Sequence, residues 1–281
     1  MHSLTASIER LAALDDPHSV PEARSIFFEF REALTQGRIR AAEKSTGPVN
    51  PGRWIVNPWV KSGILLGFRL GELSECGVGP LSFVDKDTFP PRHFLVQDRV
   101  RLVPGGSSIR TGAYVAPSVI CMPPMFVNVG AYIDEGTMID SHALVGSCAQ
   151  IGKNVHLSAA AQIGGVLEPV NAAPVIIEDN VLVGGNCGVY EGTLVRARAV
   201  LGAGTILTRS TPLYDLVYDK VYRGTSTTPL EVPEAAVVVP GSRAVRNKIA
   251  SELGISLYAP VIVKYRDQKT DLGVEMEEWL R

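Results

Sequence analysis

Two side chains that exchange protons stand two residues apart in the middle of this 281-residue chain. Asp140 carries a carboxylate, and His142 carries an imidazole whose ordinary pKa is about 6.5. Either group can take a proton from a reacting molecule if it lies within hydrogen-bond reach. The alternatives are a carboxylate that is solvated or caps a corner, and an exposed histidine without a role. The residue types therefore define a candidate acid–base site and leave these alternatives open.

Other residues that often do chemistry give no second site. Neither Cys76 nor Cys148 belongs to a CxxC pair. A trimeric β-helix metalloenzyme of the carbonic anhydrase type needs three histidines that converge at the subunit interface. Only His142 and His156 lie in the central repeats, and their spacing of 14 does not match such a site. We therefore predict no metal site, and we interpret His156 as structural.

A six-residue repeat positions these side chains. An aliphatic residue or cysteine recurs every six positions, and a small or β-branched residue mostly follows four places later. The repeating positions are Ile109, Val115, Cys121, Val127, Ile133, Ile139, Val145, Ile151, Leu157, Ile163, Ile177, Val183, Val189, Val195, Leu201 and Leu207. The count slips by two between Ile163 and Ile177 and then resumes. Antiparallel strands repeat by two and would not hold a period of six, whereas a parallel β-helix does.

We therefore predict a mainly β fold, a left-handed parallel β-helix with an N-terminal α-rich domain and a small C-terminal α+β cap. Three hexads form one triangular coil, so Ile139 and Val183 fall on the same face. Asp140 follows the inward Ile139 and should point outward. The expected ranges are 1–106 for the N-terminal domain, 107–212 for the β-helix with a loop insertion near 164–176, and 213–281 for a hairpin, partial coil, strand and helix.

Composition and charge exclude several function classes. The net charge of −2 gives no basic surface for nucleic acid or an acidic membrane. No apolar run is long enough to span a membrane, and no secretory signal is visible. The four cysteines form no paired framework, which indicates a reduced, cytoplasmic protein. Residues 1–100 show no Gly-rich nucleotide fold, which excludes a nucleotide-sugar pyrophosphorylase with a β-helix tail.

Several strings make the similarity more specific than the repeat. They are VGSCAQIGKNVHLS at 145–158, IGGVLEP at 163–169, the segment 127–140, the helix-forming segment 54–69 and the strand 258–264. The chain resembles the tetrahydrodipicolinate N-succinyltransferase family of lysine and diaminopimelate biosynthesis over nearly its whole length. The resemblance implies an acyl-CoA-dependent N-acyltransferase that acts on tetrahydrodipicolinate (2-amino-6-oxopimelate when opened). It also implies a homotrimer with sites between subunits, and acetyl-CoA or succinyl-CoA as a co-substrate rather than a tightly bound cofactor.

The resemblance assigns roles to individual residues. Asp140 matches the catalytic aspartate, and Arg101, Asp140 and Ser141 match the substrate-binding positions, with Arg99 as a register competitor for Arg101. His142 is a further candidate proton acceptor. The coenzyme groove is expected to involve Gly165, Ala203 and Lys264.

Departures from the family pattern bear on the acyl group. A glutamate implicated in catalysis is Gly188 here, and a nearby arginine is Asn186. The tail carries Asp271 and several glutamates in place of a more basic stretch. These changes predict a preference for acetyl-CoA, as in homologues from secondary pathways such as tabtoxin biosynthesis, although Arg209, Arg223 or Arg243 could supply a clamp. The alternative is a scaffold or regulatory paralogue that has lost its chemistry.

Overall fold

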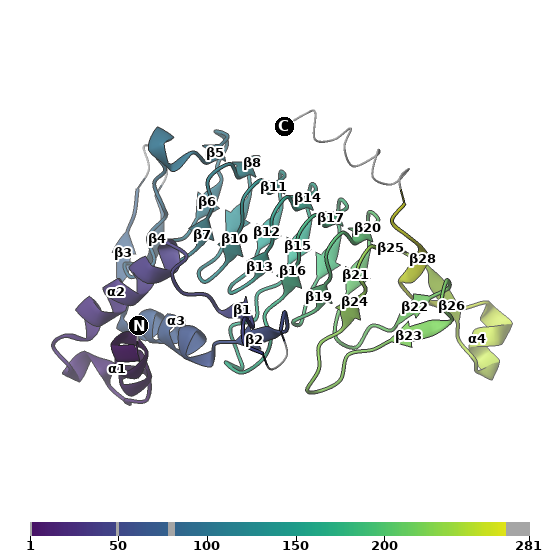
Figure 1. Ribbon diagram of the computed structural model, residues 1–281, viewed down its shortest axis with the longest axis horizontal. Helices are drawn as coiled ribbons and strands as arrows, with labels where there is room; N and C mark the ends of the chain where they lie inside the picture. Colours follow the sequence, from purple (N-terminus) through teal and green to yellow (C-terminus); the bar gives the residue numbers. More distant parts are fainter. Residues whose placement is uncertain (1, 49–50, 78–81, 268–281) are drawn as a thin grey trace.

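The chain forms a parallel β-helix with a helical domain at one end and a small cap at the other (Figure 1). The structure is a computed structural model, and it describes residues 2–48, 51–77 and 82–267. Residues facing each other in successive coils are eighteen positions apart, as Ile133 is from Ile151 and Cys121 from Ile139. The predicted β-helix is confirmed.

Three sheets make the sides of the coils. The first sheet contains β7 (Tyr114–Val115), β10 (Tyr132–Ile133), β13 (Gln150–Ile151), β16 (Ile176–Ile177), β19 (Leu194–Val195) and β24 (Glu231–Val232). The ten-stranded sheet contains β5 (Arg101–Leu102), β8 (Ile120–Cys121), β11 (Met138–Ile139), β14 (His156–Leu157), β17 (Leu182–Val183), β20 (Val200–Leu201), β25 (Ala236–Val239), β28 (Val261–Tyr265), β22 (Leu213–Asp215) and β23 (Lys220–Tyr222). The third sheet contains β6 (Ser108–Ile109), β9 (Phe126–Val127), β12 (Leu144–Val145), β15 (Gln162–Ile163), β18 (Gly188–Val189) and β21 (Ile206–Leu207).

The hexad explains why such short strands are stable. The repeating residue of every strand from β6 to β21 is buried in one continuous core along the axis. Each coil covers its apolar row only by stacking on its neighbours, so the strands depend on the stack rather than on their own length. Cys121 and Cys187 lie in this core, as their positions in the repeat predicted.

Two details of the repeat differ from the sequence-based prediction. The step from β15 to β16 takes fourteen residues where six are usual, so the chain inserts eight residues rather than slipping by two. Residues 164–175 form the connection, and the coil closes normally on either side because Gln150 pairs with Ile176. The parallel ladder also begins before residue 107, since β5 pairs with β8.

The N-terminal helices pack around an aromatic core. The helices are α1 (His2–Ala12), α2 (Ala23–Thr35) and α3 (Pro58–Leu70). The same domain also contains two 3-10 helices, η1 (Pro17–Ser19) and η2 (Val96–Asp98), and four short strands, β1 (Ala42–Lys44), β2 (Trp54–Val56), β3 (Leu73–Glu75) and β4 (Val84–Lys86). Glycine in α3 allows close packing, because a Cβ on Gly67 would lie 2.3 Å from the ring of Phe27 and one on Gly63 would lie 2.5 Å from Phe30. These glycines weaken the helix locally but let the aromatic side chains fill the interior.

A buried carboxylate joins the N-terminal domain to the coils. Glu178 accepts hydrogen bonds from Trp54 Nε1 (2.9 Å) and from the Ala197 backbone N–H (3.1 Å). Lys44 and Arg196 lie 3.2 Å and 3.4 Å from its Oε1. Burial alone would raise the pKa of Glu178, but the Trp54 hydrogen bond and the Lys44 charge outweigh it and leave the pKa below its usual value. The ionised form therefore holds β2 against the first sheet.

The C-terminal cap combines a hairpin, a further coil edge and a short helix. Strands β22 and β23 pair antiparallel, β25 continues the coil beside β20, and β28 pairs with β25. The cap also contains β26 (Ser242–Ala244), α4 (Lys248–Leu253) and β27 (Ser256–Tyr258). The predicted helix 275–281 and the tail substitutions at 269–278 lie outside the described residues.

Candidate active site

Asp140 stands at the corner where the ten-stranded sheet turns into the third sheet. It follows Ile139, which is fully buried, and its own side chain is half-buried at the surface. Its Oδ1 accepts a 2.7 Å hydrogen bond from the Ser141 backbone N–H. Within the described part of the chain the carboxylate has no ion-pair partner, so its second oxygen can accept a proton or hydrogen bond from a ligand.

His142 lies at the same corner and lines an open hollow. Its backbone is left-handed at φ 63°, and its side chain is exposed. The hollow, of about 420 Å³, is also lined by Leu144 and Gln162 of the third sheet. Gln162 Nε2 donates a 3.2 Å hydrogen bond to the His142 carbonyl oxygen. The structure therefore places Asp140, Ser141 and His142 together at one corner.

The same corner two coils further on carries Asn186. The Ala160 N–H donates to the Ser141 carbonyl, and the Asn186 N–H donates to the Ala159 carbonyl, so these corners stack directly. This arrangement confirms the prediction that the strands at 139 and 183 share a face, since β14 pairs with both β11 and β17. Asn186 thus lies in the column of His142, with Ala160 between them.

Gly188 is in a different position from Asn186, because it lies on the third sheet beneath an aromatic ring. A Cβ on Gly188 would be 2.4 Å from Cε2 of Tyr190, and one on Gly164 would be 2.7 Å from Cδ1. The Tyr190 ring therefore covers two glycines in adjacent coils and fills the space that a side chain at 188 would need. Sequence reasoning missed Tyr190, although an aromatic residue two positions after a strand glycine was a usable signal.

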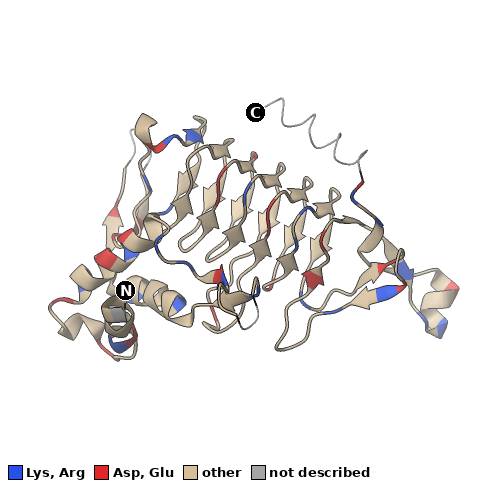
Figure 2. Cartoon of the chain, viewed as in Figure 1, with Lys and Arg blue, Asp and Glu red and all other residues tan. Residues whose placement is uncertain are grey.

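The corner and the outward side of the third sheet form one face without lysine or arginine, here called the cation-free face. The segments that make it are 104–109, 122–127, 140–145, 158–163, 184–189 and 202–207. They contain no lysine or arginine, and Asp140 is their only carboxylate. Figure 2 shows where the charged residues lie along the ribbon. A ligand group against this face meets Asp140 and His142 but no cation from the face itself.

Arg101 lies on the neighbouring face. It belongs to β5 and pairs with Ile120, which in turn pairs with Met138, two residues before Asp140. Its side chain is exposed and makes no ion pair with any described residue. Arg99, the register competitor, lies outside the strand and ends η2 in a left-handed conformation at φ 54°. Arg101 is therefore the arginine that shares a sheet with the strand leading to Asp140.

The three expected coenzyme-binding residues lie on separate elements. Gly165 lies in the long connection after β15, Ala203 is exposed at the corner after β20, and Lys264 is in β28. Lys264 Nζ lies 3.4 Å from the Asp267 carboxylate. None of the three lines either of the two cavities described here, so their assignment stays a prediction.

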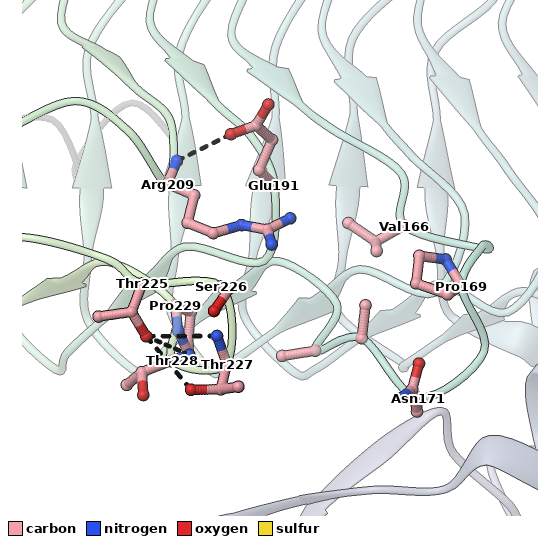
Figure 3. A pocket seen from close by; sticks show the side chains of 12 residues that line it. Val166, Pro169, Asn171, Glu191, Arg209, Thr225, Ser226, Thr227, Thr228 and Pro229 are labelled. Atoms are coloured by element: carbon pink, nitrogen blue, oxygen red, sulfur yellow. Dashed lines mark hydrogen bonds between the residues drawn. The ribbon is translucent and has the colours of Figure 1, made fainter.

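A second cavity lies between two loops on another edge of the coils (Figure 3). It has a volume of about 410 Å³; the connection 164–175 and residues 225–229 form its walls. Arg209 and Glu191 lie between these walls, and Glu191 Oε2 accepts a 3.0 Å hydrogen bond from the Arg209 backbone N–H. The Arg209 guanidinium has no ion-pair partner among the described residues, so an anionic group could bind it.

The described residues contain neither a metal-binding cluster nor a membrane-spanning helix. No group of three His, Cys, Asp or Glu side chains in the described ranges could hold a metal ion. Among those same residues, no helix has the length and apolarity needed to cross a bilayer.

Comparison with known proteins adds a consistent set of relatives. Residues 4–70 match the model described as tetrahydrodipicolinate N-succinyltransferase N-terminal, and residues 174–209 match the hexapeptide repeat of succinyl-transferase. The chain is 41% identical over 266 residues to a 2,3,4,5-tetrahydropyridine-2,6-dicarboxylate N-succinyltransferase of Nitrobacter hamburgensis, covering 92% of this chain and 90% of the relative. It is 42% identical over 272 residues to the protein of the same name from Polynucleobacter asymbioticus, covering 94% and 92%. The solved structure of a putative 2,3,4,5-tetrahydropyridine-2-carboxylate N-succinyltransferase from Campylobacter jejuni aligns with a TM-score of 0.44 at 17% identity, covering 83% of this chain and 61% of that one.

Proposed function

The chain belongs to the tetrahydrodipicolinate N-succinyltransferase family, and we propose that it N-acylates the ring-opened form of 2,3,4,5-tetrahydropyridine-2,6-dicarboxylate. It is an acyl-CoA-dependent N-acyltransferase of lysine and diaminopimelate biosynthesis or a related pathway. The observation that carries the site assignment is the outward carboxylate of Asp140. Its Oδ1 accepts the Ser141 N–H, and its other oxygen can bind a ligand on a face that has no lysine or arginine.

The reaction requires a group that accepts a proton and a hydrogen-bond donor that stabilises the oxyanion developing on the thioester oxygen. The acceptor amine attacks the thioester carbon, the carbon–sulfur bond breaks, and the proton lost by nitrogen ends on the departing sulfur or in solvent. Asp140 accepts a hydrogen bond from the amine and orients its lone pair, or takes its proton directly. His142, two residues away at the same corner, is the second titratable group that can receive or relay this proton. Ser141, which lies between these two residues in the sequence, is assigned to binding of the acyl acceptor.

Arg101 supplies a cation for the dicarboxylate acceptor. Its exposed guanidinium has no ion-pair partner among the described residues, and its strand shares a sheet with β11. A guanidinium binds a carboxylate through two parallel hydrogen bonds, which fixes orientation as well as charge. We therefore propose that Arg101 binds one carboxylate of the acceptor.

We propose acetyl-CoA as the donor, in contrast to the succinyl group in the relatives' names. The cation-free face offers no lysine or arginine to a distal carboxylate, and the Tyr190 ring occupies space above Gly188. Burying an unpaired carboxylate costs several kcal/mol, whereas an acetyl group has no such charge. Arg209 is the competing observation, because it is a cation free to bind a succinyl carboxylate, but it lies on another edge of the coils.

We also propose that the protein acts as a homotrimer in the cytoplasm, with no tightly bound cofactor. The outward row of the ten-stranded sheet supports assembly, since Ile120, Met138, His156, Leu182, Val200 and Val237 stack in register and all of them except His156 are apolar. The free cysteines fit a reducing compartment. No observation favours the scaffold alternative that Gly188 raised.

Two measurements test this proposal. Thiol release from acyl-CoA should depend on added tetrahydropyridine dicarboxylate, and mass spectrometry should detect the N-acyl product. Hydrolysis that is independent of the acceptor would contradict the assignment. Sedimentation should show a trimer, and a fully active monomer would exclude a site shared between subunits.

A further inference from the structure

Lys61 is a fully buried lysine in α3 that lacks a carboxylate partner. Its exposed fraction is 0%, and no ion pair reaches it within the described ranges. Burial lowers the pKa of its ammonium, and the only charge interaction of note is with the Cys148 thiol. Burial also raises the pKa of Cys148 to about 12, so that thiol is neutral and does not compensate the ammonium. Burying a lysine without a carboxylate partner costs free energy of folding, and hydrogen bonds from its amino group offset only part of that cost.

The Lys61 ammonium makes a hydrogen bond that crosses from the N-terminal domain to the long connection of the β-helix. Its Nζ donates a 2.6 Å bond to the carbonyl oxygen of Ala172. The two residues are 111 positions apart in sequence. Leu167, in the same connection, packs against the apolar core of the N-terminal helices. The connection is therefore fixed from outside the coils at two points.

The residue that Lys61 holds is part of a cavity wall. Ala172 and its neighbours Asn171 and Ala173 line the cavity that also contains Arg209 (Figure 3). The Ala173 carbonyl lies against Gly192, where a Cβ would be only 2.5 Å away. A connection with eight inserted residues has few ladder hydrogen bonds of its own, so the bond from Lys61 helps to hold this wall in place.

We propose that Lys61 is a positioning residue: it holds the connection 164–175 through the Ala172 carbonyl and so fixes the wall of the Arg209 cavity, where an anionic group of a substrate binds. This inference rests on the proposed acyl-CoA chemistry for its kinetic consequence, but the tether itself does not. Lys61 contacts no substrate atom, and its effect passes through the loop. A methionine would fill a similar volume without a charge to desolvate.

The test compares Lys61→Met with Leu66→Ala, a fully buried position in the same helix. Lys61→Met should leave the Tm equal to or above that of wild type, because an apolar side chain replaces an unpaired buried charge. Thermolysin should nevertheless cut within 164–175 roughly tenfold faster, as expected when a tethered segment opens more often. The KM for acyl-CoA or for the acceptor should rise at least about fivefold.

Leu66→Ala should show the opposite pattern. Its cavity should lower the Tm by roughly 5–15 °C, while thermolysin cleavage within 164–175 under native conditions and both KM values stay near wild type. Lys61→Met with a lowered Tm, wild-type loop cleavage and wild-type KM values would overturn the proposal and make Lys61 merely structural. If wild type shows no transferase activity, the proposed function fails, and the cleavage comparison still decides whether Lys61 tethers the loop.

Discussion

Replacing Asp140 by asparagine isolates the charge and basicity of its carboxylate. The amide oxygen of asparagine can keep the 2.7 Å hydrogen bond from the Ser141 N–H. The side chain is half-buried and has no ion-pair partner in the described chain, so no stabilising contact is lost. We expect the free energy of unfolding to change by no more than about 0.5 kcal/mol.

The effect on turnover should be far larger. Removing a general base or the group that orients the attacking amine typically costs about two or more orders of magnitude in rate. A hundredfold fall in kcat corresponds to about 2.7 kcal/mol of transition-state stabilisation. The assay is acceptor-dependent thiol release at saturating acyl-CoA, with the Tm measured on the same preparation.

Asp134 provides a matched control one hexad earlier. It follows the inward Ile133, and its Oδ1 accepts a 2.9 Å hydrogen bond from the Glu135 N–H, as Asp140 does from Ser141. It stands at a different corner, so Asp134→Asn should keep near-wild-type turnover. Wild-type kcat in Asp140→Asn, or an equal loss in Asp134→Asn, would refute the role assigned to Asp140.

Two further predictions concern specificity and stability. Gly188→Ala should displace the Tyr190 ring, since the new Cβ would lie 2.4 Å from it, and should lower kcat/KM at least about fivefold. The double variant Gly188→Ala/Tyr190→Val should recover part of this loss. Additive losses from the two substitutions would contradict the packing argument. Glu178→Gln should lower the free energy of unfolding by about 2 kcal/mol at pH 7, because charged hydrogen bonds to Trp54 and the Ala197 N–H weaken. The pKa of Glu178 is lowered in the folded state, so the stability that its ionised form contributes is fully present above the unfolded pKa of about 4.3 and is lost as pH falls through the folded value. Urea titrations at pH 7 and pH 3 should show the unfolding free energies of mutant and wild type converging at the lower pH.

The repeat was readable from sequence because its physical cause is local. Burying one aliphatic residue every six positions specifies the coil, and that rule also gave the outward direction of Asp140 and its shared face with Asn186. The inserted connection was harder to place. In the sequence, the spacing between Ile163 and Ile177 looks like a two-residue shift in the six-residue repeat. Only the pairing of Gln150 with Ile176 shows that eight residues leave the coil.

Contacts between distant segments were not accessible in the same way. Nothing in the local sequence of α3 links Lys61 to Ala172, because the bond depends on how the helical domain docks on the coils. Tyr190 illustrates an intermediate case, since its ring covers Gly164 of the preceding coil as well as Gly188. The repeat placed both glycines on one face, but it did not specify the direction of the tyrosine side chain.

The most direct test of this account compares kcat/KM for acetyl-CoA and succinyl-CoA with tetrahydropyridine dicarboxylate as the acceptor. The cation-free face predicts that thiol release depends on the acyl acceptor and that kcat/KM is at least about tenfold higher for acetyl-CoA than for succinyl-CoA. That ratio requires only about 1.4 kcal/mol of differential transition-state binding, less than the cost of burying an unpaired carboxylate. A kcat/KM for succinyl-CoA equal to or above that for acetyl-CoA would contradict the account and would indicate a cation, such as Arg209, that binds the distal carboxylate.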